Sequence, residues 1–370
     1  GEIPIDALAS KAPLYDRKWT KTKLPEKKIK TKDLNKVKLE DALIKILSSP
    51  NQSNKSWVTE QFDQMVMTDT AQKSGGNAAI IRIHKKEKAI AVTVDSSSNY
   101  CKAHPLTGGK QIVCESWRNL ISVGSKPIAI TNCLNFGNPE NANVMGEFAE
   151  CLLGVKEACE FLDYPVVSGN VSFYNGTNKK NIDPTPVIGG VGLIKEPKNK
   201  INHLLKKEEN IILQIGKTFG HLYQSVFFKE IYSITEGPPP EVNLSNEKSN
   251  GEIVLKLIKN RLIESVHDIS SGGLILALTE MCLPSGFGLK VDKPSKLSNL
   301  MEYYFGEDQG RYLLEIDPIN LAKVIKILSE NNIYNEKVAT VQKDNLEILG
   351  ELKINVGDLY KINNSWYNNY

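Results

Sequence analysis

The sequence predicts an α/β protein built from two sheet-forming units, and three observations lead to this prediction. Short apolar runs of strand length, such as 80–83 and 89–94, alternate with longer segments whose apolar residues recur at helical spacing. The chain has 370 residues, which is enough for two ordinary domains. A polar and basic stretch at 195–207 interrupts the alternation, as a connection between two units would.

The composition is that of a globular protein and indicates neither a membrane nor a nucleic acid as a partner. Hydrophobic residues make up 41% of the chain and charged residues 24%. No apolar run approaches the roughly 20 residues that a membrane helix needs. The net charge is only +3, and the lysine-rich stretch 18–38 contains no arginine and a single aromatic residue, which favours a solvated linker.

The cysteines indicate the cellular compartment of the protein, and the N-terminus indicates whether the chain is part of a longer one. The six cysteines form neither a CxxC pair nor a His/Cys cluster with zinc spacing. This pattern favours reduced, mostly buried thiols in a cytoplasmic protein. The chain starts with Gly1 rather than Met and has no signal peptide at this end, so we expect a piece of a longer protein.

Residues 1–74 are expected to form a connector with short helices. The stretch 1–38 is polar and contains three prolines, which indicates an extended chain. Apolar residues at helical spacing predict a helix at 39–49. Asn54 is a candidate N-cap for a second short helix at 54–63.

The two sheet-forming units are expected at 75–196 and 197–370. The first unit should contain strands at 77–84, 88–95, 127–134, 165–174 and 185–194, and helices at 109–123 and 141–162. The second unit should contain strands at 210–215, 287–291, 311–316 and 336–342, and helices at 247–262, 272–281 and 319–331.

The segment 168–172 (SGNVS) is the first candidate site. It follows the start of an apolar strand, and its glycine would let a ligand approach the backbone closely. Asn170 offers a carboxamide oxygen, which suits a hard cation such as magnesium. Ser172 lies on the same strand face as Asn170 because strand side chains alternate. A polar strand end without a ligand would explain the same residues.

The segment 131–139 (TNCLNFGNP) is the second candidate. Turn chemistry accounts for its Gly-Asn-Pro end. It does not account for Asn132 and Asn135, which interrupt an apolar strand. Such amides need hydrogen-bond partners, which either the protein or a ligand can supply.

The segment 267–274 (HDISSGGL) is the third candidate and leads from a strand into an apolar helix. Asp268 and the two serines could cap that helix, and the glycines allow a tight turn. The free N–H groups of such a helix start would also suit a phosphate. Both interpretations stay open at this point.

A series of short segments, taken in order, resembles one enzyme family. The segments are 12–17 (APLYDR), 57–63 (WVTEQFD), 75–79 (GGNAA), 118–120 (RNL), 133–139 (CLNFGNP), 168–174 (SGNVSFY), 184–189 (PTPVIG) and 267–274 (HDISSGGL). Each of these short segments is common in proteins when it is taken alone. Their order and spacing, however, are similar to those of the C-terminal half of the phosphoribosylformylglycinamidine synthase family, small type.

The resemblance implies a fold of the aminoimidazole-ribonucleotide-synthetase type. Such a fold has two α/β (α+β) subdomains, and the sheet of the first pairs across a dimer or pseudo-dimer axis to form a barrel. The resemblance also implies an ATP-dependent carbon–nitrogen ligase of purine biosynthesis. In that reaction ATP activates the amide oxygen of formylglycinamide ribonucleotide, ammonia from glutamine displaces phosphate, and Mg²⁺ neutralises the polyphosphate.

The resemblance assigns four residues of this chain to the reaction. Asn132 and Gly169 match ATP contacts, Asn170 matches a magnesium ligand, and Ser172 matches a contact to the ribonucleotide substrate. The family commonly has Asp where this chain has Asn132. None of the five histidines matches the catalytic position, so no catalytic residue is expected in this chain and the chain alone is expected to be inactive.

The resemblance also names the expected partners. They are the N-terminal half of the same synthase, which would carry the catalytic histidine, a glutaminase subunit and a small accessory subunit. A homodimer of this chain is a further expectation, because the sheet edge meant for the other half would be exposed.

Two other functions remain as alternatives. The chain could be a freestanding, non-catalytic member of the fold that binds nucleotide or acts as a scaffold. It could also be a complete relative, such as a thiamine-phosphate kinase or a selenophosphate synthetase. Those enzymes carry an acid-rich, phosphate-binding segment before the first sheet, and residues 1–74 contain none.

Overall fold

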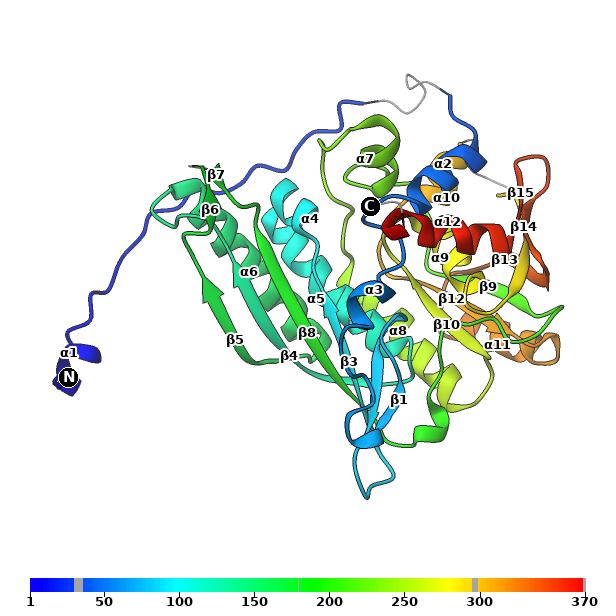
Figure 1. Ribbon diagram of the computed structural model, residues 1–370, viewed down its shortest axis with the longest axis horizontal. Coiled ribbons are helices and arrows are strands. Elements are labelled where there is room, and N and C mark those ends of the chain that lie inside the picture. Colours follow the sequence, from blue (N-terminus) through cyan, green and yellow to red (C-terminus); the bar gives the residue numbers. More distant parts are fainter. Residues whose placement is uncertain (30–35, 179, 295–298, 369–370) are drawn as a thin grey trace.

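The computed structural model describes residues 1–370 apart from 30–35, 179, 295–298 and 369–370. It contains one large sheet in each half of the chain, with helices packed against both (Figure 1). The first sheet has the order β1-β2-β3-β8-β4-β5, and the second has the order β10-β12-β9-β13-β11-β14-β15. The predicted α/β class is therefore confirmed.

The first sheet is mostly antiparallel, and only its edge strand β5 runs parallel to its neighbour β4. Its strands are β1 (Thr70–Gln72), β2 (Ala79–Arg82), β3 (Ala89–Asp95), β4 (Lys126–Asn135), β5 (Val166–Ser172) and β8 (Thr185–Ile194). A small hairpin of β6 (Gly176–Thr177) and β7 (Lys180–Asn181) lies beyond β5 along the chain. All five strands predicted for this unit are present.

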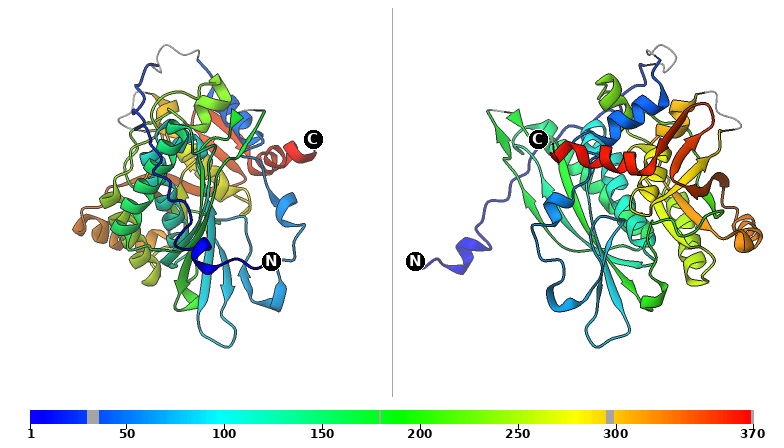
Figure 2. Two further views of the ribbon diagram at one scale, coloured as in Figure 1. Left: turned by 90° about the vertical axis from the view of Figure 1, so that its left-hand side faces the viewer. Right: turned by 45° about the vertical axis from the view of Figure 1, so that its right-hand side comes forward.

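One face of the first sheet is covered by helices and the other is open. Helices α4 (Ser98–Ala103), α5 (Pro105–Ile121) and α6 (Ala142–Leu162) lie on one side of the sheet (Figure 2, left). The opposite side, called the open face below, carries Val94, which is 71% exposed, together with Ile81 and Val191. Helix α5 begins four residues before the predicted start. Gly109, at which the predicted helix began, lies inside α5 and packs directly on the backbone of Cys151 in α6. This close packing explains why the position is a glycine.

The second sheet is enclosed by helices. Its strands are β9 (Ile211–Ile215), β10 (Ser265–Ile269), β11 (Phe287–Val291), β12 (Arg311–Ile316), β13 (Asn335–Lys343), β14 (Asn345–Ile348) and β15 (Leu352–Asn355). Its helices are α7 (Val226–Tyr232), α8 (Leu244–Lys259), α9 (Gly273–Cys282), α10 (Leu300–Phe305), α11 (Pro318–Glu330) and α12 (Val356–Asn368). A short helix η3 (Pro197–Asn199) lies in the connection between the two sheets.

The residues before the first sheet contain α1 (Ile5–Leu8), α2 (Leu39–Leu47), α3 (Ser56–Thr59) and η2 (Val66–Thr68). The predicted helix at 39–49 is present as α2. The helix predicted at 54–63 was wrong in length, because α3 has a single turn. The side chain of Asn54 accepts a hydrogen bond from the backbone N–H of Ser56 at 2.7 Å, yet the helix ends at Thr59.

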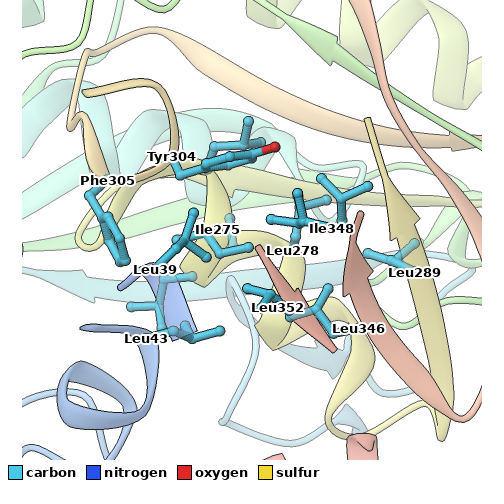
Figure 3. Packing of buried hydrophobic residues seen from close by; sticks show 14 of the residues in the cluster. Leu39, Leu43, Ile275, Leu278, Leu289, Tyr304, Phe305, Leu346, Ile348 and Leu352 are labelled. Carbon is cyan, nitrogen blue, oxygen red and sulfur yellow. The ribbon is translucent and has the colours of Figure 1, made fainter. Parts of the chain in front are cut away.

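Two large hydrophobic clusters hold the molecule together. One lies on the second sheet and includes Leu39 and Leu43 of α2, which pack with Ile275 and Leu278 of α9 (Figure 3). The other cluster joins buried residues of both sheets through α5 and α8, so the two sheets share one continuous core. Among the described residues, no helix is long and apolar enough to cross a membrane.

The N-terminal segment crosses the surface as an extended strap, here defined as residues 17–29. The backbone N–H of Thr20 donates to Ala142 at 3.0 Å, and that of Thr22 donates to the buried carboxylate of Glu150 at 2.7 Å. Further along, the N–H of Ile29 donates to the hydroxyl of Tyr223 at 2.7 Å. The strap therefore runs from α6 on the first sheet to the region of α7 in the second.

Candidate functional site

The four site residues predicted from sequence lie on the adjacent strands β4 and β5. In the parallel pairing of these strands, Asn132 is opposite Gly169, and Asn170 is opposite Cys133. Ser172 follows at the end of β5, opposite Asn135. The sequence motifs at 131–139 and 168–172, which lie far apart in the chain, therefore form one polar region at the edge of the first sheet.

The alternation of strand side chains divides these four residues between the two faces of the sheet. Asn132 and Gly169 face α6, where Asn132 lines a cavity together with residues of that helix. Asn170 and Ser172 point to the open face. The two predicted ATP contacts thus share one side of the sheet, and the predicted magnesium ligand and substrate contact share the other.

Gly169 is required by the position of Asn132. A Cβ atom at residue 169 would overlap the Asn132 Oδ1 atom and would lie 2.7 Å from its backbone oxygen. Real Cβ atoms do not approach a backbone oxygen so closely, so any other residue would push the two strands apart. The glycine in this motif is explained by close packing between strands.

The cavity beside Asn132 has a volume of about 450 Å³. Leu152 and Val155 of α6 and Tyr164 form an apolar wall, and Lys156 and Glu160 lie at its polar rim. This volume is within the range of small-molecule sites, which are mostly apolar with a few polar groups. The arrangement can accept a flat, apolar ring and present one amide to its edge.

The asparagines of these motifs differ in how their amides are satisfied. Asn135 donates to the backbone oxygens of Cys133 and Thr185, at 3.3 Å in each case, so its role is structural. Within the described part of the chain, the side chains of Asn132 and Asn170 have no hydrogen-bond partner. Both are therefore available to a ligand. The hydroxyl of Ser172 donates a hydrogen bond to the side-chain oxygen of Asn175 at 3.3 Å.

The structure corrects the prediction that Asp268 caps helix α9. Asp268 lies in β10, is 4% exposed and faces Arg118, with 3.8 Å between its Oδ2 atom and the arginine Nε. The N-cap of α9 is Gly272, and no side chain of the 267–274 segment caps the helix. Gly272 instead donates its backbone N–H to the remote carboxylate of Glu307 at 2.8 Å.

The carboxyl group of Glu307 therefore lies at the start of α9, where the sequence suggested that a phosphate could bind. Its Oε1 atom also accepts the backbone N–H of Val226 at 2.7 Å, at the start of α7, and its Oε2 accepts the Tyr100 hydroxyl at 2.5 Å. Burial raises the pKa of Glu307 to about 7, although these hydrogen bonds act in the opposite direction. Tyr100 belongs to α4, so this carboxyl connects the first sheet's helices to the second unit.

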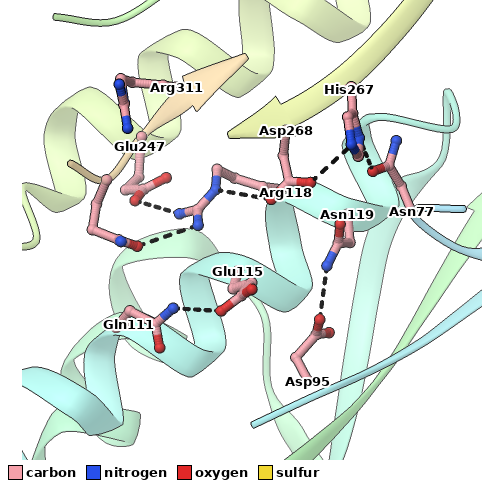
Figure 4. Close-up of polar contacts among 12 residues, drawn as sticks. Asn77, Asp95, Gln111, Glu115, Arg118, Asn119, Glu247, His267, Asp268 and Arg311 are labelled. Carbon is pink, nitrogen blue, oxygen red and sulfur yellow. Dashed lines mark hydrogen bonds and ion pairs between the residues drawn. The ribbon is translucent and has the colours of Figure 1, made fainter. Parts of the chain in front are cut away.

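A buried polar cluster around Arg118 joins the two units and was missed by sequence reasoning (Figure 4). Arg118 of α5 is fully buried and donates to Glu247 of α8 at 2.7 Å and to Gln309 at 3.2 Å. Burial raises the pKa of Glu247, and the charge of Arg118 opposes that rise. The signal present in the sequence was the 118–120 segment, whereas Glu247 is an ordinary acidic residue within a predicted helix.

Further buried ionisable groups surround this cluster. Burial raises the pKa of Asp95 to about 8, and the charge of Glu115 adds to the rise. Burial alone would lower the pKa of His267, but the hydrogen bond with Glu280 and that carboxylate's charge raise it. Across the described ranges, no group of three or more His, Cys, Asp or Glu side chains is arranged to hold a metal ion.

Comparison with protein families accounts for most of the chain. The model of the AIR synthase related protein, N-terminal domain, matches residues 75–194, and the model of the corresponding C-terminal domain matches residues 207–350. The chain belongs to the AIR synthase related family. The first match covers the first sheet except β1, and the second covers the second sheet up to β14.

Within this family, the similar curated proteins share one name. The chain is 53% identical over its full length to the phosphoribosylformylglycinamidine synthase subunit PurL of Pelagibacter ubique, and 42% identical to that of Rhodopseudomonas palustris. It covers 51% and 50% of these two proteins. The chain thus spans about half the length of the curated relatives it matches, and the family resemblance inferred from the sequence is confirmed.

Solved structures support the fold. Thermotoga maritima PurL complexed with FGAR aligns with a TM-score of 0.70 at 15% identity, covering 88% of this chain and 54% of that one. The same protein complexed with ATP aligns with a TM-score of 0.56 at 24% identity, covering 92% and 46%. At these identities the likeness establishes the AIR-synthase-type fold alone.

Proposed function

We propose that this chain is the C-terminal half of an ATP-dependent synthase of purine biosynthesis. The whole enzyme would convert formylglycinamide ribonucleotide, with ammonia from glutamine, into formylglycinamidine ribonucleotide. The main support is the 53% identity along the entire chain to a protein named as a subunit of that synthase. The chain itself would contribute a few ligand contacts, while the catalytic histidine would come from the half that is not present here.

The cavity beside Asn132 fits the adenine ring of ATP. The accessible apolar residues of its lining, Leu152 and Val166, would contact the ring. The unpartnered amide of Asn132 can accept a hydrogen bond from an amino group and donate one to a ring nitrogen. Gly169 would support this contact indirectly, because it has no side chain and so leaves room for the Asn132 amide over the strand.

The open face fits one magnesium contact and one substrate contact. Asn170 offers a single amide oxygen, a ligand type that Mg²⁺ accepts. No cluster of carboxylates accompanies it among the described residues, so most ligands of the ion would come from the other half. When bound, Mg²⁺ would neutralise the phosphates of ATP during phosphoryl transfer. Ser172 would position the ribonucleotide through its hydroxyl.

The partner of the open face would be the first sheet of the other half. The open face carries apolar side chains on β2, β3 and β8, among them Ile81, Val94 and Val191. Within the described ranges, edge strand β5 has no paired strand on its outer side. Pairing with a similar sheet would cover this surface and close a barrel. We further infer that a glutaminase subunit and a small accessory subunit join the complete enzyme.

The test is reconstitution of the synthase from its parts. This chain would be mixed with the separately prepared other half of the Pelagibacter ubique relative and a glutaminase, and product formation would be followed with ATP, glutamine and the ribonucleotide. Activity is expected only in the mixture. Asn170→Ala should reduce it about tenfold or more, the loss that one disturbed metal or substrate contact can cause.

Asn331→Ala is the matched control, because Asn331 lies at the exposed end of α11, far along the chain from the site. This variant should leave activity in the mixture unchanged. Turnover by the chain alone would contradict the division of the site between two halves. A folded and bound mixture without any activity would instead favour the non-catalytic scaffold.

A further inference from the structure

The segment between α3 and β1 presents large apolar side chains to solvent. Within ten residues, Phe62 is 69% exposed, Met67 is 73%, Met65 is 45% and Val58 is 37%. Scattered single apolar residues are normal on protein surfaces, but a group of four in one short stretch is not. We call residues 58–67 the apolar segment.

Three hydrogen bonds tie the apolar segment to itself and to the start of β1, although the Asp63 side chain remains exposed. Gln64 donates through Nε2 to the backbone oxygen of Thr59 at 3.0 Å, and its own backbone oxygen accepts the hydroxyl of Thr70. The carboxylate of Asp63 accepts the backbone N–H of Met65 at 2.7 Å. These bonds hold the backbone in a shape that places the apolar side chains outside.

A strained backbone conformation at the end of the apolar segment also helps to turn its apolar side chains toward solvent. Met67 and Thr68 have φ values of 58° and 59°, in the left-handed region that residues other than glycine rarely adopt. Such conformations cost about 1–3 kcal/mol each and persist where the surroundings impose them, often at binding sites. Here Arg82 of β2 donates to the backbone oxygen of Thr68 at 2.8 Å and fixes the turn.

The apolar segment lies on the open side of the first sheet. Helices α5 and α6 are on one side of this sheet and the chain after α3 is on the other (Figure 2, left). The segment leads into β1 at the sheet edge, and Ile81 on the neighbouring strand β2 is 41% exposed on the open face. The segment therefore lies on the same side of the sheet as the open face and leads into its β1 edge.

We propose that the apolar segment is a second docking element for the missing half of the longer relatives, in addition to the open face. This inference rests on the proposed function, which supplies the partner. The chain spans about half the length of its relatives, so their remaining part is a candidate occupant of matching size for this surface. Phe62 and Met67 would insert into an apolar pocket of that partner, and the fixed backbone would reduce the entropy lost on binding.

The test compares two pairs of exposed residues by their effect on association. Phe62→Glu/Met67→Glu alters the apolar segment, and Phe219→Glu/Leu349→Glu alters residues of closely matched exposure, 73% and 76%, on the second unit. Binding of each variant to the unmatched part of the Pelagibacter ubique relative would be measured by sedimentation velocity and calorimetry. The far-ultraviolet spectrum and thermal transition would establish that both variants are folded.

The proposal expects Phe62→Glu/Met67→Glu to weaken association at least tenfold and Phe219→Glu/Leu349→Glu to leave it within about twofold. Equal affinity for both variants and the unaltered chain would overturn it. Loss of binding on Val94→Lys, in the open face, alongside such equal affinities would leave the proposed function standing. Failure of the unaltered chain to bind at all would count against the proposed function itself. A milder pair, Phe62→Ser/Met67→Ser, replaces the glutamates if they disturb folding.

Discussion

At the scale of single residues, the contact between Asn132 and Gly169 gives a direct prediction. Gly169→Ala places a methyl group against the Asn132 amide and 2.7 Å from its backbone oxygen, so strand β5 must shift. We expect a loss of about 1–3 kcal/mol in the free energy of unfolding, as for other overpacked positions. Urea denaturation would measure it, and Asn132→Ala in the same chain should restore part of the loss because the two residues are coupled.

Gly357→Ala is the control for this prediction. Gly357 lies at the start of α12, and an added Cβ would meet only the flexible amide of Asn355 at 3.0 Å. Alanine is the better helix former, so this variant should be neutral or slightly more stable. Equal losses for both glycines would show that the strand contact is not what requires Gly169.

The raised pKa of Glu307 predicts a pH dependence of stability. The carboxyl keeps its proton in the folded protein up to pH about 7, whereas in the unfolded chain it ionises near 4.5. Between these values unfolding releases a proton, so the stability contributed by this group falls as the pH rises. The shift corresponds to roughly 3 kcal/mol at most.

Glu307→Gln removes this titration while keeping a side-chain oxygen for the two backbone N–H groups. Urea unfolding of both proteins from pH 4.5 to 8 should therefore give a flatter profile for the variant. Other buried groups, such as Asp95, titrate in both proteins, so only the difference between the two profiles is informative. Parallel profiles would contradict the assignment of the proton to Glu307.

Polar residues of this chain differ in how far the sequence alone indicates their role. Asn132 was singled out as an amide that interrupts an apolar strand, and Asn170 as a possible ligand for a hard cation. The structure leaves both without a protein partner among the residues it describes, whereas Asn135, chosen for the same reason as Asn132, bonds to the backbone. Arg118, Glu247 and Glu307 were not found as a cluster. Each is an ordinary charged residue locally. The packing of α5 against α8 buries Arg118 with Glu247, and Glu307 is buried separately by its contacts with Gly272, Val226 and Tyr100.

At the scale of elements, helix α12 depends on aromatic packing against the chain near α3. The rings of Trp57 and Tyr367 stack with centroids 4.8 Å apart, and Asn54 donates to Asn364 at 2.9 Å. Trp57→Ala should lower the free energy of unfolding by about 1–2 kcal/mol and loosen the end of α12. The reason is that a stacked aromatic pair contributes stability beyond that of the apolar area it buries. Hydrogen exchange should become faster at residues 360–367.

Trp19→Ala serves as the comparison, since Trp19 is 46% exposed on the strap. It should leave exchange in α12 unchanged. If both tryptophan variants alter α12 equally, a general loss of stability rather than the stack would be the cause.

Elements with strong periodicity were predicted well, and those that depend on tertiary contacts were not. The long helix α6 and strand β8 agree with prediction to within a residue. The start of α5 was placed four residues late, and Gly108 and Gly109, close to that start, allow close packing on Cys101 and Cys151. Short elements such as α4, α7 and α10 were missed, since six or seven residues hold too few turns to establish a period.

At the scale of the whole molecule, the open face predicts self-association of the isolated chain. Val94 is 71% exposed and Val191 is 36% exposed on the side of the sheet that faces away from α4, α5 and α6. We expect a dimer in sedimentation equilibrium at micromolar concentration, with the two open faces in contact. Val94→Lys/Val191→Lys should give a monomer, because charged groups would be buried without partners.

Phe219→Lys, on the second unit and 73% exposed, should not affect the dimer. A chain that is monomeric over the whole concentration range would rule out this mode of pairing.

The arrangement of the units was beyond sequence reasoning. The boundary at 195–207 lies between the two sheets, and the family models match on either side of it. Yet α2, from the expected connector, packs into the core of the second sheet, and the second hydrophobic cluster joins both sheets. Period and composition describe one element at a time and contain no information on which faces meet.

The fit between Asn132 and Gly169 also restricts how this protein can have evolved. Residue 169 cannot gain a side chain whichever residue stands at 132, because the added Cβ atom would lie 2.7 Å from the backbone oxygen of that residue. Exchange of Asn132 for aspartate preserves shape and passes through no clash, which leaves that single change accessible in either direction. Natural relatives should therefore keep glycine at residue 169 while residue 132 changes between asparagine and aspartate.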